Sequence, residues 1–338
     1  MIPITIIGGG IAGLSLGIAL RRGGVPVTLH EAGHYPRHRV CGEFISGVSR
    51  STLERLGITM HLTDSVTNRS TGWFHRDRKI LSYSLGSPAL GISRYRLDQR
   101  MAAHFSRIGG SLHTGQRMSG ETGGVSCVWA AGRTPAKSEW LGLKMHLLNC
   151  PIEEDLEMHL GDGAYVGLSR IEDGRVNVCG LFRRRVGIAT AKEEILFRYL
   201  KATGLPALEK KLRESSPVEE SATATAGFDF HRRVPAPGEI RLGDAYAAIP
   251  PFSGNGMSMA LESAEAACDP LLDYARREIS WEEACRETKR SLIRRFRTRL
   301  ATANLLHPFL TGRRSQFVLV LLQRCRLLPI GSLSRMLR

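Results

Sequence analysis

The chain has 338 residues, of which 42% are hydrophobic and 23% are charged, and its formal net charge is +15. Hydrophobic and charged contents of this size are typical of a globular protein. The longest apolar candidate for a membrane span is residues 317–322, far shorter than the roughly 20 residues that cross a bilayer. The seven cysteines are odd in number and form no C-x-x-C pair, so we expect neither a disulfide framework nor a metal site.

The positive charge is concentrated at the C-terminal end of the chain. Residues 286–338 contain thirteen lysines and arginines and a single acid, Glu287, which gives this segment a net charge of +12. The remaining 285 residues together carry only +3. The main body is therefore nearly neutral, and the basic character belongs to a tail.

The first thirty residues predict a strand, a helix and a second strand in succession. Residues 2–7 form a short β-branched apolar run that is typical of a buried parallel strand. Apolar residues then recur near helical spacing over residues 11–20, and the glycine pair 23–24 ends this helix. Residues 25–29 are predicted to form the second strand, which leads to Glu31.

Farther along the chain the pattern indicates an antiparallel meander. Asp162-Gly163 and Asp173-Gly174 each lie between alternating apolar runs, and an Asp-Gly pair in this position is a strong hairpin signal. The other predicted elements are, in chain order, helix 51–56, strands within 70–93, helix 97–108, strand 125–130, helices 192–203 and 207–214, strand 240–242, helix 257–267 and a mostly helical tail from residue 281. The chain thus combines a βαβ opening with a separate antiparallel region.

The first glycine turn, Gly8-x-Gly10-x-x-Gly13, has the spacing of a dinucleotide-binding turn and lies between a strand and a helix. Gly8 permits the tight turn, Gly10 lets a pyrophosphate approach the backbone, and Gly13 allows the helix to pack close to the strand. Glu31 follows the second strand, where a carboxylate accepts hydrogen bonds from ribose hydroxyls. The pattern predicts a nucleotide with a free ribose, and both FAD and NAD satisfy it.

A second glycine turn, residues 243–257 (GDAYAAIPPFSGNGM), follows the predicted strand 240–242 and leads into a helix of small residues. This stretch resembles the second FAD motif of the para-hydroxybenzoate hydroxylase and geranylgeranyl reductase superfamily. The resemblance implies that Asp244 binds the ribityl chain of the flavin and that the following helix points its N-terminus at the pyrimidine edge. A helix N-terminus stabilises the negative charge of a reduced flavin.

Two further stretches are similar to the same superfamily. Residues 39–44 (RVCGEF) resemble the loop after the ribose-binding acid in geranylgeranyl-reductase-like members. Residues 91–98 (GISRYRLD) resemble a segment that enters a helix with an arginine that contacts FAD. Together the matches extend over residues 2–267, and they imply that Arg39 and Arg94 belong to the cofactor site.

The resemblance implies an α/β fold, α+β overall, with a Rossmann-like FAD-binding domain of the glutathione-reductase type. We expect an antiparallel-sheet substrate domain inserted into it and a basic helical tail after it. The expected limits are 1–70, 94–140 and 236–275 for the discontinuous FAD-binding domain, 71–93 and 141–235 for the substrate domain, and 276–338 for the C-terminal region.

The expected FAD-binding residues are Gly8, Gly10, Ile11, Ala12, Gly13, Glu31, Arg39, Arg94, Asp244, Gly254, Asn255 and Gly256. A helix cap would also explain Asp244, and an ordinary turn would also explain residues 254–256. Tyr246 and Phe252 flank the second glycine turn and either pack in the core or line an apolar substrate pocket. Cys41 is either a buried thiol or a catalytic group that donates a proton or positions the substrate.

One stretch departs from the superfamily pattern. Many members carry an Asp-Gly pair after the strand predicted here at 125–130, and the pair serves the flavin and the reduced pyridine nucleotide. This chain has Ala130-Ala131-Gly132-Arg133, which keeps the glycine and lacks the acid. The difference leaves NAD(P)H open as the electron donor and makes a separate reductase or electron carrier an alternative.

The resemblance implies a FAD-dependent oxidoreductase and leaves two activities open. The first, which family breadth favours, is a flavin monooxygenase that hydroxylates an apolar aromatic or polyketide-like molecule. The second is a reductase that delivers hydride to an isoprenoid double bond, as the loop around Cys41 suggests. A non-catalytic basic protein that binds membranes or nucleic acid is an alternative of another class, against which the intact glycine turns argue.

The basic tail contains two amphipathic helical patterns. Leu292, Phe296 and Leu300 recur four residues apart among arginines, and residues 317–328 form a second pattern. These helices either pack across the FAD-binding domain with their arginine heads in water or adsorb to anionic lipid. No nucleic-acid motif accompanies the charge, so we expect no nucleic-acid partner. The resemblance implies an apolar small-molecule substrate. We expect a cytoplasmic protein, with peripheral membrane contact through residues 286–338 as the open alternative.

Overall fold

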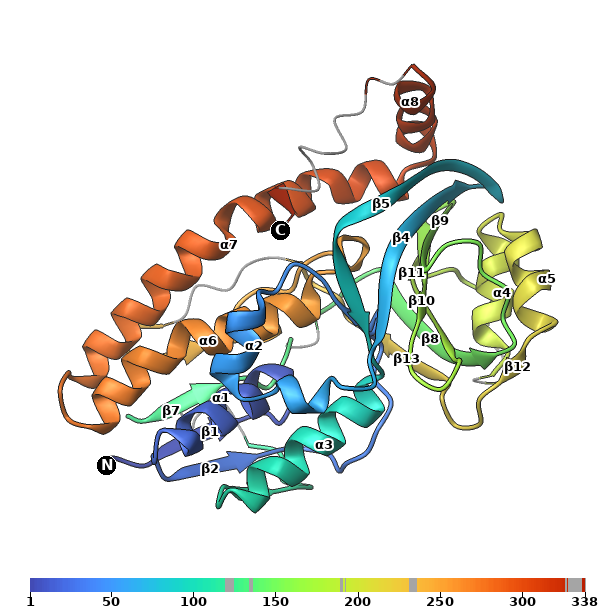
Figure 1. The fold of residues 1–338 in the computed structure, drawn as a ribbon. Helices are drawn as coiled ribbons and strands as arrows, with labels where there is room; N and C mark the ends of the chain where they lie inside the picture. Colours follow the sequence, from blue (N-terminus) through green and yellow to red (C-terminus); the bar gives the residue numbers. More distant parts are fainter. Residues whose placement is uncertain are drawn as a thin grey trace.

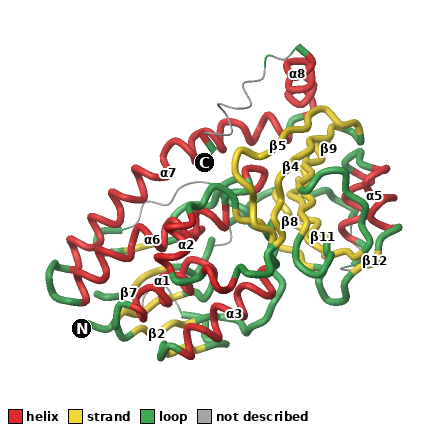
Figure 2. Tube along the Cα trace, viewed as in Figure 1, coloured by secondary structure: helices red, strands yellow, loops and turns green. Residues whose placement is uncertain are grey.

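Two β-sheets and a long C-terminal helix organise the chain (Figure 1). The computed structural model describes residues 1–118, 125–133, 136–188, 191, 193–230, 236–325, 327 and 336–337. The first sheet is parallel, and the second is mostly antiparallel and lies beside it (Figure 2). The predicted α/β architecture, with a Rossmann-like sheet, a separate antiparallel sheet and a helical C-terminal region, is therefore confirmed.

The first sheet consists of short parallel strands in the order β14-β7-β1-β2-β6. Its strands within the described residues are β1 (Ile4–Ile7), β2 (Val27–His30), β6 (Ser111–His113), β7 (Cys127–Trp129) and β14 (Ile240–Arg241). β1 lies in the centre, where Ile4 and Ile6 are almost fully buried, as is typical of a parallel strand with both faces covered. The sheet collects strands from the beginning, middle and end of the described sequence, and the residue limits of the predicted domains stay a prediction.

Three helices pack around the first sheet, namely α1 (Ile11–Arg22), α3 (Arg94–Arg107) and α6 (Gly256–Ala275). α1 contacts both α3 and α6, and its leucines and isoleucines are buried on several faces. A helix that is apolar all round must be covered on every side. α1 therefore lies in the interior, where its N-terminus is held in a fixed position.

The second sheet follows the order β12-β8-β11-β10-β9-β4-β5-β3, with β13 also paired to β8. The Asp162-Gly163 turn joins β9 to β10 and the Asp173-Gly174 turn joins β10 to β11, so both predicted hairpins are confirmed. The strands are β3 (Phe44–Ile45), β4 (Val66–His75), β5 (Arg78–Gly91), β8 (Trp140–Leu148), β9 (Leu156–Gly161), β10 (Ala164–Arg170), β11 (Val176–Arg183), β12 (Ser216–Pro217) and β13 (Thr223–Ala226).

One pairing in the second sheet differs from the expected antiparallel meander. β4 pairs with β9 in parallel, with Thr71 opposite Leu156 and His75 opposite Leu160. The β4–β5 hairpin comes far earlier in the chain than β9, so no tight turn constrains their relative direction. This pairing joins the β4–β5 hairpin to the meander, so that their strands belong to one continuous sheet.

The remaining helices are α2 (Arg50–Leu56), α4 (Ile195–Ala202), α5 (Pro206–Arg213), α7 (Trp281–Thr311) and α8 (Arg313–Arg324), with 3-10 turns η1 (Thr59–His61), η3 (Gly243–Ala245) and η4 (Pro251–Ser253). α4 and α5 cover the second sheet, where Leu200 and Leu212 pack with Leu143 of β8. The second sheet thus has a hydrophobic core of its own.

The two amphipathic patterns of the tail have different outcomes. In α7, Leu292, Phe296 and Leu300 are 2%, 0% and 6% exposed, so this helix packs against the body of the protein. In α8, Phe317 and Leu321 are 66% and 50% exposed, so the part of the second pattern that α8 contains faces outward. Residues 326 and 328 of this pattern lie outside the described part of the chain. Within the described residues, no helix combines the length and the apolar character that a bilayer crossing needs.

We expect the substitution Phe296→Ala to lower the free energy of unfolding by about 3–5 kcal/mol, because it leaves a cavity in a packed interface. Phe296 is fully buried and its ring lies 6.4 Å from that of Tyr246. Urea titration followed by circular dichroism measures the change. Phe309→Ala on the same helix is the matched control, because Phe309 is 45% exposed and its loss should change the stability by less than about 1 kcal/mol. Equal effects of the two substitutions would contradict the packing of α7.

Candidate functional site

The first glycine turn holds β1 and α1 in close contact. Gly8 has φ +109°, a conformation that favours glycine, and a Cβ there would overlap the carbonyl group of Ala130. A Cβ on Gly13 would overlap the carbonyl oxygen of Gly8. The turn is therefore as tight as the sequence predicts, and side chains are excluded at both positions.

Gly10 differs from these two positions because it faces open space. The only described atom within 4 Å of a Cβ at Gly10 is Nη2 of Arg94, at 3.8 Å. Gly10 precedes α1, and no side chain in the described structure caps the N-terminus of that helix. Unpaired backbone N–H groups and the positive end of the helix dipole then face the space beside Gly10. An anionic group such as a pyrophosphate fits this position.

Glu31 lies at the end of β2 and is bound to the same turn. Its Oε2 accepts a hydrogen bond from the amide of Gly9 at 2.8 Å, and its Oε1 accepts one from the amide of Gly33 at 2.9 Å. Burial favours the neutral acid, but Arg39, Arg37 and the two amides outweigh it and lower the pKa of Glu31. The carboxylate is therefore ionised and fixed beside the glycine turn.

Arg39 and Arg94 meet at one buried acid, Asp98, which is 0% exposed. Arg94 makes a bidentate contact with Asp98, through Nε at 2.8 Å and Nη2 at 2.7 Å. Arg39 approaches the same carboxylate at 3.3 Å and Glu31 at 3.5 Å. Asp98 thus orients both cations toward the turn, a role that the spacing of Arg94 and Asp98, four residues apart at the start of a helix, could have indicated.

The second glycine turn lies directly against the first. Gly243 has φ +56°, and a Cβ there would be 3.2 Å from the Cβ of Ala12 on α1. Asp244 is half-buried beside this contact. Burial raises the pKa of Asp244, whereas the nearby guanidinium groups of Arg133 and Arg94 oppose the rise. Two segments more than 200 residues apart in the sequence thus form one site around Arg94.

The loop of Gly254, Asn255 and Gly256 precedes α6. Gly254 has φ +66° and packs on the ring of Phe44, whereas a Cβ at Gly256 would meet no described atom within 4 Å. The side-chain amide of Asn255 donates a hydrogen bond to the carbonyl oxygen of Leu337 at 2.6 Å. The loop is therefore open at Gly256, and at Asn255 it binds a residue close to the C-terminus.

Arg133 occupies the stretch that departs from the superfamily pattern. Its guanidinium lies 3.8 Å from the centre of the Phe228 ring. Burial lowers the pKa of Arg133, and the carboxyl group of Asp244 opposes this change. A cation thus approaches Asp244 from the segment in which many superfamily members carry an acid.

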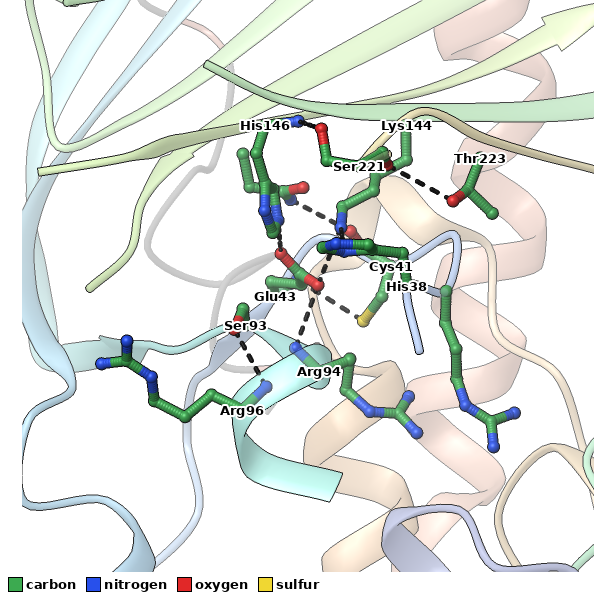
Figure 3. A network of polar contacts seen from close by, with 12 residues as sticks. His38, Cys41, Glu43, Ser93, Arg94, Arg96, Lys144, His146, Ser221 and Thr223 are labelled. Carbon is green, nitrogen blue, oxygen red and sulfur yellow. Dashed lines mark hydrogen bonds and ion pairs between the residues drawn. The ribbon is translucent and has the colours of Figure 1, made fainter. Parts of the chain in front are cut away.

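Glu43 is the centre of a buried polar network that the sequence did not predict (Figure 3). Its Oε1 accepts a hydrogen bond from the amide of Arg94 at 3.0 Å and lies 3.2 Å from Nζ of Lys144, while its Oε2 lies 2.5 Å from Nε2 of His146. Glu43, Lys144 and His146 are each at most 1% exposed. Burial favours the neutral acid, but Lys144, His146 and the Arg94 amide outweigh it and lower the pKa of Glu43.

Cys41 and His38 border this network. The Sγ of Cys41 accepts a hydrogen bond from the amide of Glu43 at 3.4 Å, and burial raises the pKa of the thiol. Nδ1 of His38 lies 3.1 Å from Nζ of Lys144, and burial together with Lys144 lowers the pKa of His38 to about 4. Near neutral pH the thiol is therefore protonated and His38 is uncharged.

The sequence of strand β8 contains a pattern from which the buried network could have been predicted. Lys144 and His146 are two residues apart, so they share one face of a strand, while Leu143, Met145 and Leu147 share the other. Two polar residues on a strand face that is buried require partners. The sequence alone does not show that those partners come from the loop around Glu43.

The two aromatic residues of the second turn, Tyr246 and Phe252, lie in different surroundings. Tyr246 is 1% exposed and packs toward Phe296 of α7, so it belongs to the core. Phe252 packs on Tyr165 of the second sheet, with ring centres 6.1 Å apart. Of the two candidates for a substrate pocket, only Phe252 reaches the boundary between the glycine turns and the second sheet.

His307 of α7 lies at the centre of an aromatic group at this boundary. Its ring centre is 5.0–5.8 Å from those of Phe230, Trp140 and Tyr165. Neither ring nitrogen has a hydrogen-bond partner within the described residues, although the residue is only 9% exposed. Burial lowers the pKa of His307 to about 4. An uncharged imidazole thus lies among aromatic rings, and neither of its nitrogens is hydrogen-bonded within the described residues.

Comparison with known proteins agrees with this geometry. The family model described as pyridine nucleotide-disulphide oxidoreductase matches residues 3–72, which contain the first glycine turn and Glu31. A search of the curated proteins by sequence finds no match. The family model covers the nucleotide-binding opening of the chain and leaves the remainder unassigned.

Solved structures share the fold over nearly the whole chain. PqsL from Pseudomonas aeruginosa, a probable FAD-dependent monooxygenase, is 18% identical, with a TM-score of 0.72 over 95% of this chain and 99% of that chain. Klebsiella pneumoniae HpxO, complexed with FAD and uric acid, is 18% identical, with a TM-score of 0.76 over 99% of this chain and 95% of that one. The flavin-dependent brominase Bmp2 is 14% identical, with a TM-score of 0.74 over 99% and 92% of the two chains. The chain therefore has the fold of FAD-dependent monooxygenases and halogenases.

We expect Glu43→Gln to lower the free energy of unfolding by about 3 kcal/mol, because it leaves the buried Lys144 ammonium without its counter-ion. Urea titration at pH 7 measures the loss. The double variant Glu43→Gln/Lys144→Met should recover a large part of it, because the uncompensated charge is then removed as well. A single variant as stable as the wild type would show that Lys144 does not depend on Glu43.

Proposed function

We propose that this chain is a FAD-dependent monooxygenase that hydroxylates an apolar aromatic or polyketide-like small molecule. The observation that carries the proposal is the contact between the two glycine turns, in which Gly243 approaches Ala12 and Arg94 faces both turns. A simple NAD dehydrogenase has no need of the second turn. The fold shared with FAD-dependent monooxygenases supports the same cofactor.

The residues of the first turn suit the adenosine and diphosphate parts of FAD. Gly10, Ile11 and Ala12 would offer backbone amides to the pyrophosphate at the N-terminus of α1. Arg39 and Arg94 would face the same phosphates. The open space beside Gly10 is the observation that supports this fit.

The residues of the second turn suit the flavin part of the molecule. Asp244 would bind the ribityl chain, and the loop of Gly254, Asn255 and Gly256 the isoalloxazine ring. The open space beside Gly256 supports the last assignment. Glu31, which lies beside the first turn, would bind the ribose of the adenosine part. FAD, when bound, supplies the reduction of dioxygen and the transfer of one oxygen atom to the substrate.

The aromatic group around His307 supports a planar apolar substrate. Phe252 connects this group to the second glycine turn, so a substrate among these rings would lie close to the proposed flavin. The neutral imidazole of His307 can accept a hydrogen bond from a phenolic hydroxyl. Uric acid in HpxO and 2-aminobenzoylacetate in PqsL are small cyclic ligands of proteins with this fold, which supports a small ring-containing substrate here.

A separate reductase or electron carrier is the electron donor that we favour. Arg133 stands where many members of the superfamily have the acid that serves the flavin and the reduced pyridine nucleotide. Its guanidinium is stacked on Phe228 and faces Asp244. Direct reduction by NAD(P)H is the alternative that the same assay tests.

Reduction of an isoprenoid double bond is the second candidate activity, and Cys41 favours it. Burial raises the pKa of this thiol, so it stays protonated and could donate the proton that one carbon of the double bond takes up after the other has received hydride. We propose that either reaction takes place in the cytoplasm with a peripheral contact at a membrane surface. The net charge of +12 in residues 286–338 supports such a contact.

Asp244→Ala should weaken FAD binding at least about tenfold, because hydrogen bonds from the ribityl hydroxyls to a charged group contribute about 1.5–3 kcal/mol. Titration of FAD into apoprotein, followed by the quenching of flavin fluorescence, measures the dissociation constant. Asp269→Ala is the matched control, because Asp269 is an exposed acid on α6 that pairs with Arg55. Equal affinities of the two variants would contradict the assignment of Asp244.

The reaction type is tested by oxygen consumption of the purified holoenzyme with candidate phenols. A monooxygenase should consume oxygen in step with product and stop under anaerobic conditions. Electrons are supplied either by NAD(P)H alone or by NADH with a separate flavin reductase, and we expect the second supply to be required. Turnover without oxygen on an isoprenoid substrate would favour the reductase, and a protein that binds no flavin would overturn both activities.

A further inference from the structure

The orientation of α8 is fixed by a buried glutamine. Gln316 is 2% exposed, and its side-chain amide donates hydrogen bonds to the carbonyl oxygens of Gly161 at 2.8 Å and Leu310 at 2.6 Å. These contacts attach α8 to the second sheet and to the end of α7. The face of α8 that bears Gln316 is therefore the face that packs on the protein.

The opposite face of α8 is apolar and exposed. Phe317, Val318, Leu321 and Leu322 are 66%, 47%, 50% and 36% exposed. Their spacing places them in one stripe of the helix, and the 3.6-residue period turns this stripe away from Gln316. Figure 1 shows α8 at the far end of α7, beyond the β4–β5 hairpin. We call these four residues the α8 stripe.

Two hollows at the start of α8 are lined with arginines. The first has a volume of about 510 Å³ and is lined by Arg183, Arg184, Arg185 and Arg313 among others. The second, of about 630 Å³, is bounded by Phe317 and Val318 of the stripe and by the arginines Arg76, Arg313 and Arg314. Arg313 lines both hollows, so cations and exposed apolar side chains share one continuous surface.

Few acids balance these cations. Arg183 pairs with Glu139 at 3.0 Å and Arg185 pairs with Asp162 at 3.4 Å. For the other four arginines, the described part of the chain provides no ion-pair partner: Arg76, Arg184, Arg313 and Arg314. The surface therefore carries an excess of positive charge directly beside the α8 stripe.

We propose that the α8 stripe and the surrounding arginines dock the protein on a bilayer of anionic phospholipid. The arginines match the phosphate groups of the lipids, and the stripe matches the acyl region just below them. A soluble anion would use the arginines and leave the stripe in water. A second copy of the chain would bring like charges together, so self-association does not fit the charge of this surface. The inference rests on the peripheral contact proposed above and assigns it to α8.

The test uses the full-length protein and vesicles of phosphatidylcholine with or without one quarter phosphatidylglycerol. We expect co-sedimentation with the anionic vesicles that weakens with salt, and little with phosphatidylcholine alone. Arg313→Gln/Arg314→Gln should weaken binding by about tenfold or more. Phe317→Ser/Leu321→Ser should abolish most of the remaining binding at 0.5 M salt, where the apolar contribution dominates.

The control variants keep the assignment to α8 separate from the general charge of the protein. Lys201→Gln/Lys210→Gln removes two exposed charges from α4 and α5 and should bind as the wild type does. Flavin binding of every variant should match that of the wild type, because none of these residues lies at the glycine turns. If the α8 variants bound the vesicles as the wild type does, only the assignment to α8 would be overturned. A wild type that ignores anionic vesicles, or a dimer abolished by Phe317→Ser/Leu321→Ser, would overturn the membrane contact as well and leave the flavin proposal standing.

Discussion

At the start of α1 the backbone of Gly8 lies against Ala130 on one side and against Gly13 on the other, with no room for a side chain. This contact brings the N-terminus of the helix to the edge of the parallel sheet. α1 is buried on several faces and packs against α3 and α6. Its position therefore determines where these two helices and the second glycine turn lie. The geometry of the whole candidate site depends on these two missing side chains.

Around this turn the cations are oriented before any ligand arrives. Asp98 holds Arg94 by two hydrogen bonds and lies close to Arg39, and Glu31 approaches Arg39 as well. Side chains fixed in this way lose little conformational freedom when an anion binds. Glu43 extends the arrangement to the second sheet, since one carboxylate contacts the backbone of Arg94 and the side chains of Lys144 and His146. The site and the interface between the two sheets are thus one polar structure.

Much of this could be predicted from local patterns. The βαβ opening follows from the apolar runs, and the hairpins follow from their Asp-Gly turns, because both signals arise within a few residues. Pairings between distant segments left no such signal, as in the parallel contact of β4 with β9 and the network at Glu43. Tyr246 shows the same limit, because only the position of α7 decides that it faces Phe296. For the tail, the sequence gives two amphipathic helices, and tertiary packing decides that one is buried and the other exposed.

The helix α7 runs along both sheets and contains one proline, Pro308, in its last turn. Its 31 residues span about 46 Å. Near one end Trp281 donates a hydrogen bond to the carbonyl oxygen of Gly238, next to β14, and at the other end the carbonyl oxygen of Thr311 accepts one from Gly163, next to β10. A rigid rod fastened at both ends acts as a strut, so the two sheets cannot swing apart like a hinged clamshell unless the rod bends or one fastening breaks. Movements of loops and side chains then offer small molecules a path between the layers that leaves α7 and both of its attachments in place.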